Sequence, residues 1–250
     1  MNLREQLLNS PKPPHQFHDA DSIEWLSLNR PEFLPKIYKL KQSFVEIVER
    51  KKPWERCNND WFTNKLIRDG IHGFRHVCRV AIYSISLALQ ARPEISEQEI
   101  EALIFAALLH DCRRVNDNAD FRHGVRAKEW LGKNNHILPK KLQPLYKAIH
   151  FAIAVHNDQY DQIIRKVNYQ KFKFFVDILK TADALDRYRF PREDWWLKNE
   201  FVVLIPNQQN MAFAYDLVLG CERLFLQTKD NQGSVERAWK KLNQDNYANR

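Results

Sequence analysis

The sequence is poor in glycine, with only 6 Gly among its 250 residues. Glycine adopts the positive φ angles of hairpin turns and β-bulges more readily than any other residue. A chain with so little of it has few positions for the tight turns that an all-β fold repeats. The low glycine content therefore disfavours an all-β fold.

Long apolar runs are also absent, and no stretch approaches the ~20 residues that a transmembrane helix needs. The first residues, 1–5, are not followed by the apolar segment of a signal peptide. We therefore expect a soluble, cytoplasmic protein with no membrane partner.

The short motifs of several enzyme classes are missing as well. The sequence contains no GxSxG, no Gly-rich phosphate loop and no HExxH, so serine hydrolase, P-loop and HExxH metalloprotease chemistry lack their parts. No CxxC pair is present either, and we expect reduced thiols rather than a disulfide framework. The cysteines are Cys57, Cys78, Cys112 and Cys221.

Positive charge is in excess, because 39 Lys and Arg oppose 31 Asp and Glu, for a net charge of +8. A balance of this size favours an anionic partner, either a phosphorylated small molecule or a nucleic acid. There is no run of five or six basic residues and no aromatic RNA-binding motif, so a nucleic-acid partner stays open and undemonstrated. The oligomeric state is not indicated by the sequence.

Hydrophobic periodicity predicts one all-α domain over about 21–250, preceded by a flexible N-terminal arm over 1–20, where prolines interrupt helices. A capping box formed by Ser96 and Glu99 opens one helix, and Gly132 is expected to follow the end of another. The predicted helices cover about 37–48, 76–91, 97–108, 122–131, 143–156, 168–189, 212–228 and 234–244.

One short apolar segment, 201–205, is bounded by Pro206. Its composition also fits a strand that pairs with part of 210–215 as a small β-hairpin. The all-α prediction therefore leaves room for a hairpin near 201–215.

Histidines and aspartates fall at the ends of predicted helices. His110 and Asp111 end a strongly apolar helix, so they should be buried, and buried polar groups need partners or a metal. Any one histidine at a helix end is usually a cap or a partner of a backbone carbonyl. The joint pattern favours a site that combines imidazole and carboxylate ligands, which suits Mn²⁺, Fe²⁺, Co²⁺ or Zn²⁺, with Mg²⁺ left open.

The order His76, then His110-Asp111, then Asp183 resembles the H…HD…D signature of the HD-domain superfamily of metal-dependent phosphohydrolases. Residues 71–80 are similar to the family's first-histidine helix, and 121–124 are similar to the His-Gly that follows the HD pair. His156 falls where the two-metal subset has a further histidine. The resemblance covers about 70–190.

This resemblance implies an HD-domain-like helical array that binds one or two divalent transition-metal ions. The first ion would be held by His76, His110, Asp111 and Asp183, and Asp111 would bridge to a second ion held by His123 and His156. The implied reaction is cleavage of a phosphate ester of a nucleotide or another small phosphorylated compound by a metal-activated water.

Developing negative charge in such a reaction needs cationic donors. We predict catalytic roles for His110, Asp111, Lys180 and Arg187. The predicted substrate-binding residues are His72, Arg79, Arg113, Arg114 and Arg126. The alternative is that these charges are solvated or only orient Asp183 and Asp186.

Two other functions stay open at this point. Some relatives with six such ligands hold two irons and activate oxygen, and a non-catalytic regulatory or nucleic-acid-binding HD module would keep the same residues. The pair Trp195-Trp196 fits stacking on a base, packing in the core or a dimer contact. The sequence does not distinguish a monoester from a diester.

Overall fold

The computed structural model describes residues 19–117, 120–199 and 202–248, which form an all-α array without a strand. This confirms the predicted fold class. The longer helices are α2 (Ala20–Leu28), α3 (Gln42–Lys51), α6 (Phe74–Ala91), α7 (Glu97–Leu109), α8 (His123–Lys133), α9 (Tyr146–Val155), α11 (Tyr169–Leu185), α12 (Gln208–Thr228) and α13 (Asn231–Ala248). Short helical segments join them: α4 (Pro53–Arg56), η2 (Asn59–Trp61), α5 (Lys65–Asp69), η3 (Asn135–Ile137), η4 (Lys140–Leu145), α10 (Tyr160–Ile163), η5 (Asp186–Arg189) and η6 (Glu193–Trp195).

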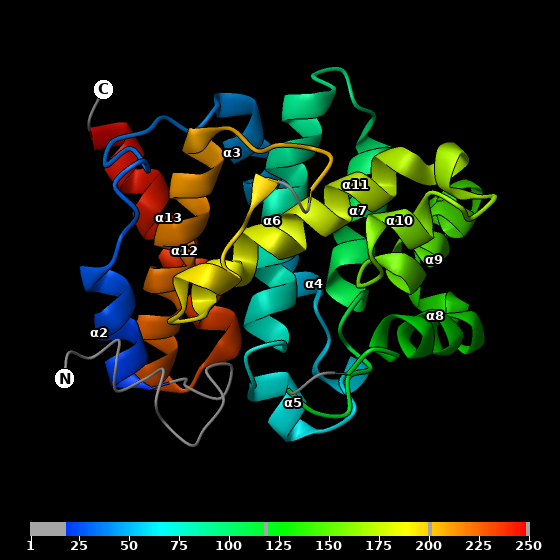
Figure 1. Ribbon diagram of the computed structural model, residues 1–250, viewed down its shortest axis with the longest axis horizontal. Coiled ribbons are helices and arrows are strands. Elements are labelled where there is room, and N and C mark those ends of the chain that lie inside the picture. The colour runs from blue at the N-terminus through cyan, green and yellow to red at the C-terminus, as the bar shows by residue number, and fades with distance from the viewer. Residues whose placement is uncertain (1–18, 118–119, 200–201, 249–250) are drawn as a thin grey trace.

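Helix α6 lies in the middle of the molecule (Figure 1). On one side it contacts α12, α13 and α3, and on the other it contacts α7 and α11. Helices α8 and α9 pack together at the far end, beyond α7. Because α6 touches both groups, a side chain on α6 can reach either the C-terminal helices or the helices around α7.

Helix α7 is apolar around most of its circumference, as expected for a helix buried on all sides. The capping box predicted at its start is present, since Ser96 accepts a hydrogen bond from the backbone of Glu99 and the Glu99 carboxylate accepts one from the backbone of Ser96. Residues 102–104 and 106–109 are completely buried. The residues that follow α7 are thereby held in the interior.

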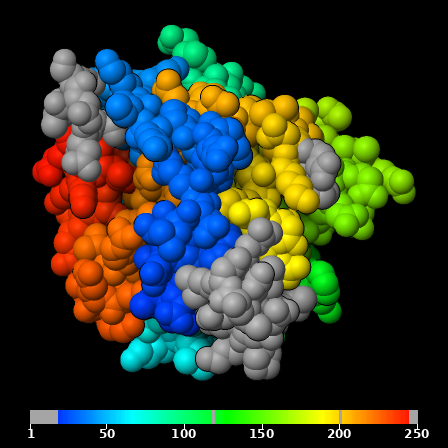
Figure 2. Space-filling view, turned by 60° about the vertical axis from the view of Figure 1, so that its left-hand side comes forward, coloured from blue at the N-terminus to red at the C-terminus, as the bar shows by residue number. Residues whose placement is uncertain are grey.

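The N-terminal helix α2 lies across α12 and the segment around 188–197 (Figure 2). The Tyr215 hydroxyl donates a hydrogen bond to the Leu26 carbonyl, and the rings of Trp25 and Trp196 have centroids 5.8 Å apart. Buried apolar side chains from Ile23 to Trp239 form one continuous core cluster. The described residues before 70 and after 190 are thus packed into the same core.

Buried charges also join α6 to α12. Arg75 and Arg79 on α6 are fully buried, and both donate hydrogen bonds to the carboxylate of Glu222 on α12. Arg79 donates in addition to both oxygens of Asp186, at 2.6 and 2.8 Å. This network fixes the position of α12 relative to α6.

The hairpin expected near 201–215 is not formed, because 208–228 is helix α12. Asn207 begins that helix as its N-cap, with a side chain that accepts a hydrogen bond from the backbone of Asn210. In the preceding segment, the carbonyl of Leu204 accepts from the Thr181 hydroxyl and that of Ile205 from the Gln90 amide. Side chains, not a partner strand, satisfy these carbonyls.

Several helix boundaries also differ from prediction. Helix α3 begins at Gln42, and Ile37, expected in it, is 75% exposed. Gly132 lies inside α8, which ends at Lys133. Pro144 lies in the 3₁₀ segment η4, so that α9 begins only at Tyr146, and the helix expected over 168–189 turns into the 3₁₀ segment η5 after Leu185.

The expected arm, 1–20, falls mostly outside the described residues, and Ala20 already belongs to α2. All four cysteines are buried, and none forms a disulfide, in agreement with the predicted reduced thiols. Among the described residues, no helix combines the length and apolarity that crossing a membrane requires.

We expect Glu222→Gln to lower the free energy of unfolding on the order of 3 kcal/mol, because it leaves two buried guanidinium groups short of one negative charge. Urea denaturation measures the loss. Glu236→Gln, which removes the half-buried partner of the exposed Lys240 on α13, should cost much less, because ion pairs with solvent-exposed groups contribute little to stability. Equal costs for the two variants would contradict this role of Glu222.

Candidate metal centre

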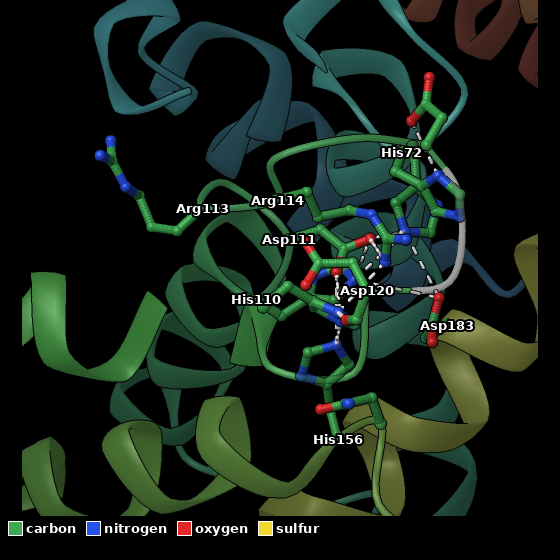
Figure 3. A network of polar contacts seen from close by, with 12 residues as sticks. His72, His110, Asp111, Arg113, Arg114, Asp120, His156 and Asp183 are labelled. Atoms are coloured by element: carbon green, nitrogen blue, oxygen red, sulfur yellow. Dashed lines mark hydrogen bonds and ion pairs between the residues drawn. The ribbon is translucent and has the colours of Figure 1, made fainter. Parts of the chain in front are cut away.

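Five helix ends bring the predicted ligands together. His76 lies near the start of α6, His110 and Asp111 follow α7, His123 begins α8, His156 follows α9, and Asp183 lies near the end of α11. Figure 3 shows several of these side chains pointing toward one another. Within this cluster, His76, His110 and Asp183 form one group whose ligand atoms lie within 4.8 Å of one another, and His110, Asp111 and His156 form another.

The two carboxylate oxygens of Asp111 face opposite sides of the cluster. Oδ2 lies 3.5 Å from His76 Nε2 and 3.9 Å from His110 Nε2. Oδ1 lies 2.9 Å from His123 Nε2 and 3.4 Å from His156 Nε2. Asp183 stands on the first side, with Oδ1 3.4 Å from His76 Nε2. Asp111 therefore separates, and could bridge, two sets of ligand atoms.

The other ring nitrogen of each histidine is already bound. Nδ1 of His110 lies 2.6 Å from the Ala107 carbonyl, and Nδ1 of His156 lies 2.8 Å from the Ile153 carbonyl. His123 makes the same contact with the carbonyl three residues earlier. A carbonyl only accepts, so each Nδ1 must carry the proton and donate it. The Nε2 atoms of the neutral rings are then left with lone pairs.

These lone pairs meet one another and the carboxylates. His123 Nε2 is 2.8 Å from His156 Nε2, and His76 Nε2 is 3.2 Å from His110 Nε2. Asp111 Oδ1 is buried and accepts no hydrogen bond among the described residues. Electron-rich atoms held this close repel unless positive charge lies between them. The donor set therefore fits a bound cation.

Protonation states agree with such a site. Burial lowers the pKa of His110 to about 3, so its ring is neutral at physiological pH. Burial alone would raise the pKa of Asp183, but His76 and His110 more than offset this and lower it to about 2. The pKa of Asp111 is lowered well below its usual range despite burial, chiefly by His123 and His110. His110, Asp111 and Asp183 are thus in the deprotonated forms that metals bind. The pKa values of His76 and His123 are raised despite burial, because Asp111 faces both rings and Asp186 also faces His76, so a metal ion there would displace protons.

Asp186 orients His76 through Nδ1, the ring nitrogen that does not face the cluster. Its carboxylate accepts a hydrogen bond from His76 Nδ1 at 2.8 Å and two from Arg79. Burial would raise the pKa of Asp186, but Arg79 outweighs this and keeps the carboxylate ionised. A carboxylate that holds the free nitrogen of a ligating histidine fixes its tautomer and ring orientation.

Gly124 lets α8 approach α9 closely. A Cβ atom at this position would lie 2.7 Å from the Ile153 carbonyl oxygen and 3.1 Å from the His156 ring. Any larger residue would push the start of α8 away and separate His123 from His156. The His-Gly pair noted in the sequence therefore has a steric reason.

A cavity of about 650 Å³ opens on this cluster. Asp111, Asp183, His123 and His156 line its floor. Its lining includes five arginine and lysine side chains, namely Arg114, Lys180, Arg187, Arg189 and Lys198, and two further carboxylates, Asp117 and Asp194. The cavity thus combines acidic and imidazole ligands with surrounding positive charge.

The predicted substrate-binding residues divide into two groups. Arg114 and His72 line the cavity, as do Lys180 and Arg187, the two cations predicted to act in catalysis. Three other predicted substrate-binding arginines, Arg79, Arg113 and Arg126, do not line it.

Each of these three is engaged elsewhere. Arg79 is enclosed by Asp186 and Glu222. Arg113 points away from the cluster, as Figure 3 shows, and donates to the Trp61 carbonyl. Arg126 donates to the Arg113 carbonyl and to Asp120. The substrate-binding role predicted for them is not supported by their placement, because closeness in sequence does not set the direction of a side chain.

The paired tryptophans have different surroundings. Trp196 is buried, and its ring lies against those of Trp25, Tyr188 and Tyr215. Trp195 is half-buried and packs against Phe190. Both contribute to the cavity wall, but Trp196 is chiefly a core residue.

Sequence reasoning missed the roles of Asp117 and Arg189. His72 Nδ1 lies 2.9 Å from Asp117 Oδ1, and burial, together with Arg189 and Arg114, lowers the pKa of His72 well below its ordinary value. Arg189 is 7% exposed and lines the same cavity. The only signal in the sequence was their closeness to predicted ligands.

The chain matches no protein-family model, no curated protein and no solved structure. What the described residues establish is geometric. Buried imidazole and carboxylate groups from five helix ends form a cluster that could hold a metal ion.

We expect Asp111→Asn to abolish Mn²⁺ binding, because the amide keeps the shape but lacks the charge that faces both ligand sets. Elemental analysis of the wild type and the variant after equilibration with Mn²⁺ tests this. The wild type should also gain about 2.7 kcal/mol of stability at a free Mn²⁺ concentration 100 times Kd. Asp161→Asn, at an exposed position outside the cluster, should bind like wild type. An Asp111→Asn protein that retains the full metal content would rule out the bridge.

Asp186→Asn should weaken Mn²⁺ binding by roughly 10- to 100-fold, the range for partners that orient a ligating histidine. Titration against a competing chelator measures the affinity. The Glu222→Gln variant is the matched control, since it removes a partner of Arg79 without touching His76. If both variants lose affinity equally, the effect comes from the core and not from the orientation of His76.

Proposed function

We propose that the chain is a metal-dependent phosphohydrolase of the HD-domain type. Its substrate would be a phosphate ester of a nucleotide or another small phosphorylated compound. One observation carries this proposal: the carboxylate of Asp111 faces two sets of imidazoles at the floor of a cavity whose walls are cationic. The order of the ligands in the sequence, H…HD…D, supports the same conclusion.

Divalent ions at such a centre supply a nucleophilic water at neutral pH and stabilise negative charge on phosphoryl oxygens. The cluster combines imidazole nitrogens with carboxylate oxygens, which favours Mn²⁺, Fe²⁺, Co²⁺ or Zn²⁺ over Mg²⁺. We propose two ions. His76, His110 and Asp183 would hold one, His123 and His156 the other, and Asp111 would bind both.

Lys180 is placed to stabilise negative charge on the substrate. Its Nζ donates to the carbonyls of His156 and Asp158, at 2.7 and 2.6 Å, which leaves a third N–H free to turn toward the cavity. Burial lowers its pKa to about 8, so the ammonium is still charged near pH 7. Arg114, held 3.7 Å from Asp111 Oδ2, and Arg187, on the exposed rim, add charge to the same space.

The size of the cavity suits a small molecule, since ligand pockets typically span about 300–1,000 Å³. The half-buried Trp195 offers an aromatic ring at its wall. A nucleotide combines an anionic group with a ring that stacks on such a side chain. We place the activity in the cytoplasm, where the four unbonded cysteines stay reduced.

Two alternatives use the same residues. A diiron oxygenase would need the same six ligands but would consume oxygen and require iron. A non-catalytic module would use the positive surface to bind nucleic acid, with a steep salt dependence that does not depend on Asp111.

We expect Mn²⁺-loaded protein to hydrolyse p-nitrophenyl phosphate. His123→Gln should lower kcat at least about 100-fold, since it removes one of the two histidines proposed for the second ion and leaves the ligands of the first ion intact. His136→Gln, at an exposed histidine outside the cavity, is the matched control and should hydrolyse like wild type. Elemental analysis should find one ion fewer in His123→Gln.

Unchanged turnover in both His123→Gln and Asp111→Asn would refute hydrolysis at this centre. Oxygen consumption that occurs only with Fe²⁺ would favour the oxygenase instead. Salt-sensitive binding of RNA or DNA by Asp111→Asn, with no turnover in the wild type, would favour the binding module.

A further inference from the structure

Arg189 is a buried cation whose donors are largely unused. The residue is only 7% exposed, and its Nε and Nη1 atoms are buried without a hydrogen-bond acceptor among the described residues. Its nearest anion is Asp186, with Nη1 3.6 Å from Oδ2, beyond hydrogen-bond distance. Leaving buried donors unpaired is costly, and most folded proteins avoid it.

Two other buried arginines have guanidinium groups that are hydrogen-bonded to carboxylates. Arg75 donates to Glu222 at 3.0 Å, and Arg79 donates to both oxygens of Asp186 and to Glu222. Neither lines the cavity, whereas Arg189 does. The buried arginine with unused donors therefore lies beside the space that a ligand can enter.

The position of Arg189 is fixed relative to the metal ligands. Its guanidinium lies 4.2 Å from the centroid of the Phe190 ring, which supports it from one side. Asp186, beside Arg189, also accepts the hydrogen bond from His76. Arg189 is thus held close to the His76 and Asp183 side of the centre, in the same cavity as Arg114 and Lys180.

The ligand that such a group needs is an oxyanion. A guanidinium offers donors in a planar fork that matches two oxygens of a phosphate. Because its carboxylate neighbour Asp186 is already shared by Arg79 and His76, the oxygens must come from outside the chain's described residues.

We infer that the substrate is a phosphate monoester. Two of its terminal oxygens would face the two ligand sets on either side of Asp111, and Arg189 would bind the third. This inference rests on the proposed function. A monoester has three terminal oxygens on phosphorus, so one can face each side of Asp111 and a third can face Arg189. A diester has only two terminal oxygens and leaves one of these three positions without a partner.

The reaction is a hydrolysis in which atoms and charge balance. The oxygen of water forms a bond to phosphorus, and the ester P–O bond breaks with its electron pair going to the leaving oxygen. One proton of the water ends on the leaving alcohol, and the other stays on the inorganic phosphate.

The direct test compares two anions that differ in their terminal oxygens. Calorimetric titration of Mn²⁺-loaded protein with inorganic phosphate and with dimethyl phosphate measures both affinities without turnover. Wild type should prefer inorganic phosphate, and Arg189→Gln should lose roughly 10- to 100-fold in phosphate affinity and most of that preference. Arg189→Lys, which keeps the charge but not the fork, should fall between them.

Arg192→Gln is the matched control, because Arg192 lies three residues further on, pairs with Asp194 and does not line the cavity. It should bind phosphate like wild type. Urea denaturation adds a second readout: Arg189→Gln should unfold at a midpoint equal to or above wild type, since it removes an unsatisfied buried charge. A merely structural arginine would instead lower the midpoint when replaced.

Kinetics then separate this inference from the proposed function. Wild type should cleave p-nitrophenyl phosphate faster than bis(p-nitrophenyl) phosphate, and Arg189→Gln should lower kcat/KM on the monoester while Arg192→Gln does not. A preference for the diester, or unchanged phosphate affinity in Arg189→Gln, would overturn the inference even if hydrolysis depends on Asp111. Turnover that is absent with both esters, or that survives in Asp111→Asn, would refute the proposed function instead, and the phosphate titration would still decide whether Arg189 binds the anion.

Discussion

Each histidine of the cluster donates a hydrogen bond from Nδ1 to a fixed acceptor, and this constraint leaves Nε2 as the only ring atom that can act as a ligand. Three rings donate Nδ1–H to the carbonyl three residues earlier, and His76 donates to Asp186. The remaining nitrogens carry lone pairs that converge on Asp111 in a buried space. A cation placed among these atoms would stabilise such an arrangement. The packing of five helix ends against one another therefore creates the cluster that could hold a metal ion.

The C-terminal helices belong to this arrangement even though they carry no ligand. Glu222 on α12 neutralises Arg75 and Arg79, and Arg79 holds Asp186, which holds His76. Removing any one of these groups leaves a buried charge without its partner, and this lowers the stability of the fold. Glu222, which the sequence resemblance left unassigned, thus neutralises the arginine that pairs with Asp186.

Sequence reasoning located the ligands because their position depends on local structure. A buried helix that ends in His110-Asp111 must place that pair in the interior, and the structure brings the other four predicted ligands to it. The two interpretations of a histidine at a helix end, carbonyl partner and ligand, both apply, since they concern different nitrogens. The sequence could not predict the directions of long side chains, and Arg79 and Arg113 do not line the cavity. It could not predict the contact between His76 and Asp186 either, because these residues are 110 positions apart. The expected hairpin failed for the same reason, because distant side chains satisfy its backbone.

Buried polar groups without hydrogen-bond partners indicate where a ligand would bind. Among the described residues, the charged side chains in this state are Asp111, Arg189 and Arg30. Arg30 has carboxylate and carbonyl partners through its other nitrogens. Asp111 and Arg189 are left, and they have opposite charge and line the same cavity. They do not pair with each other, so a cation alone satisfies one and an anion alone satisfies the other. A metal ion together with a phosphate would satisfy both, so the proposed metal centre and the proposed anion site would act as a single unit.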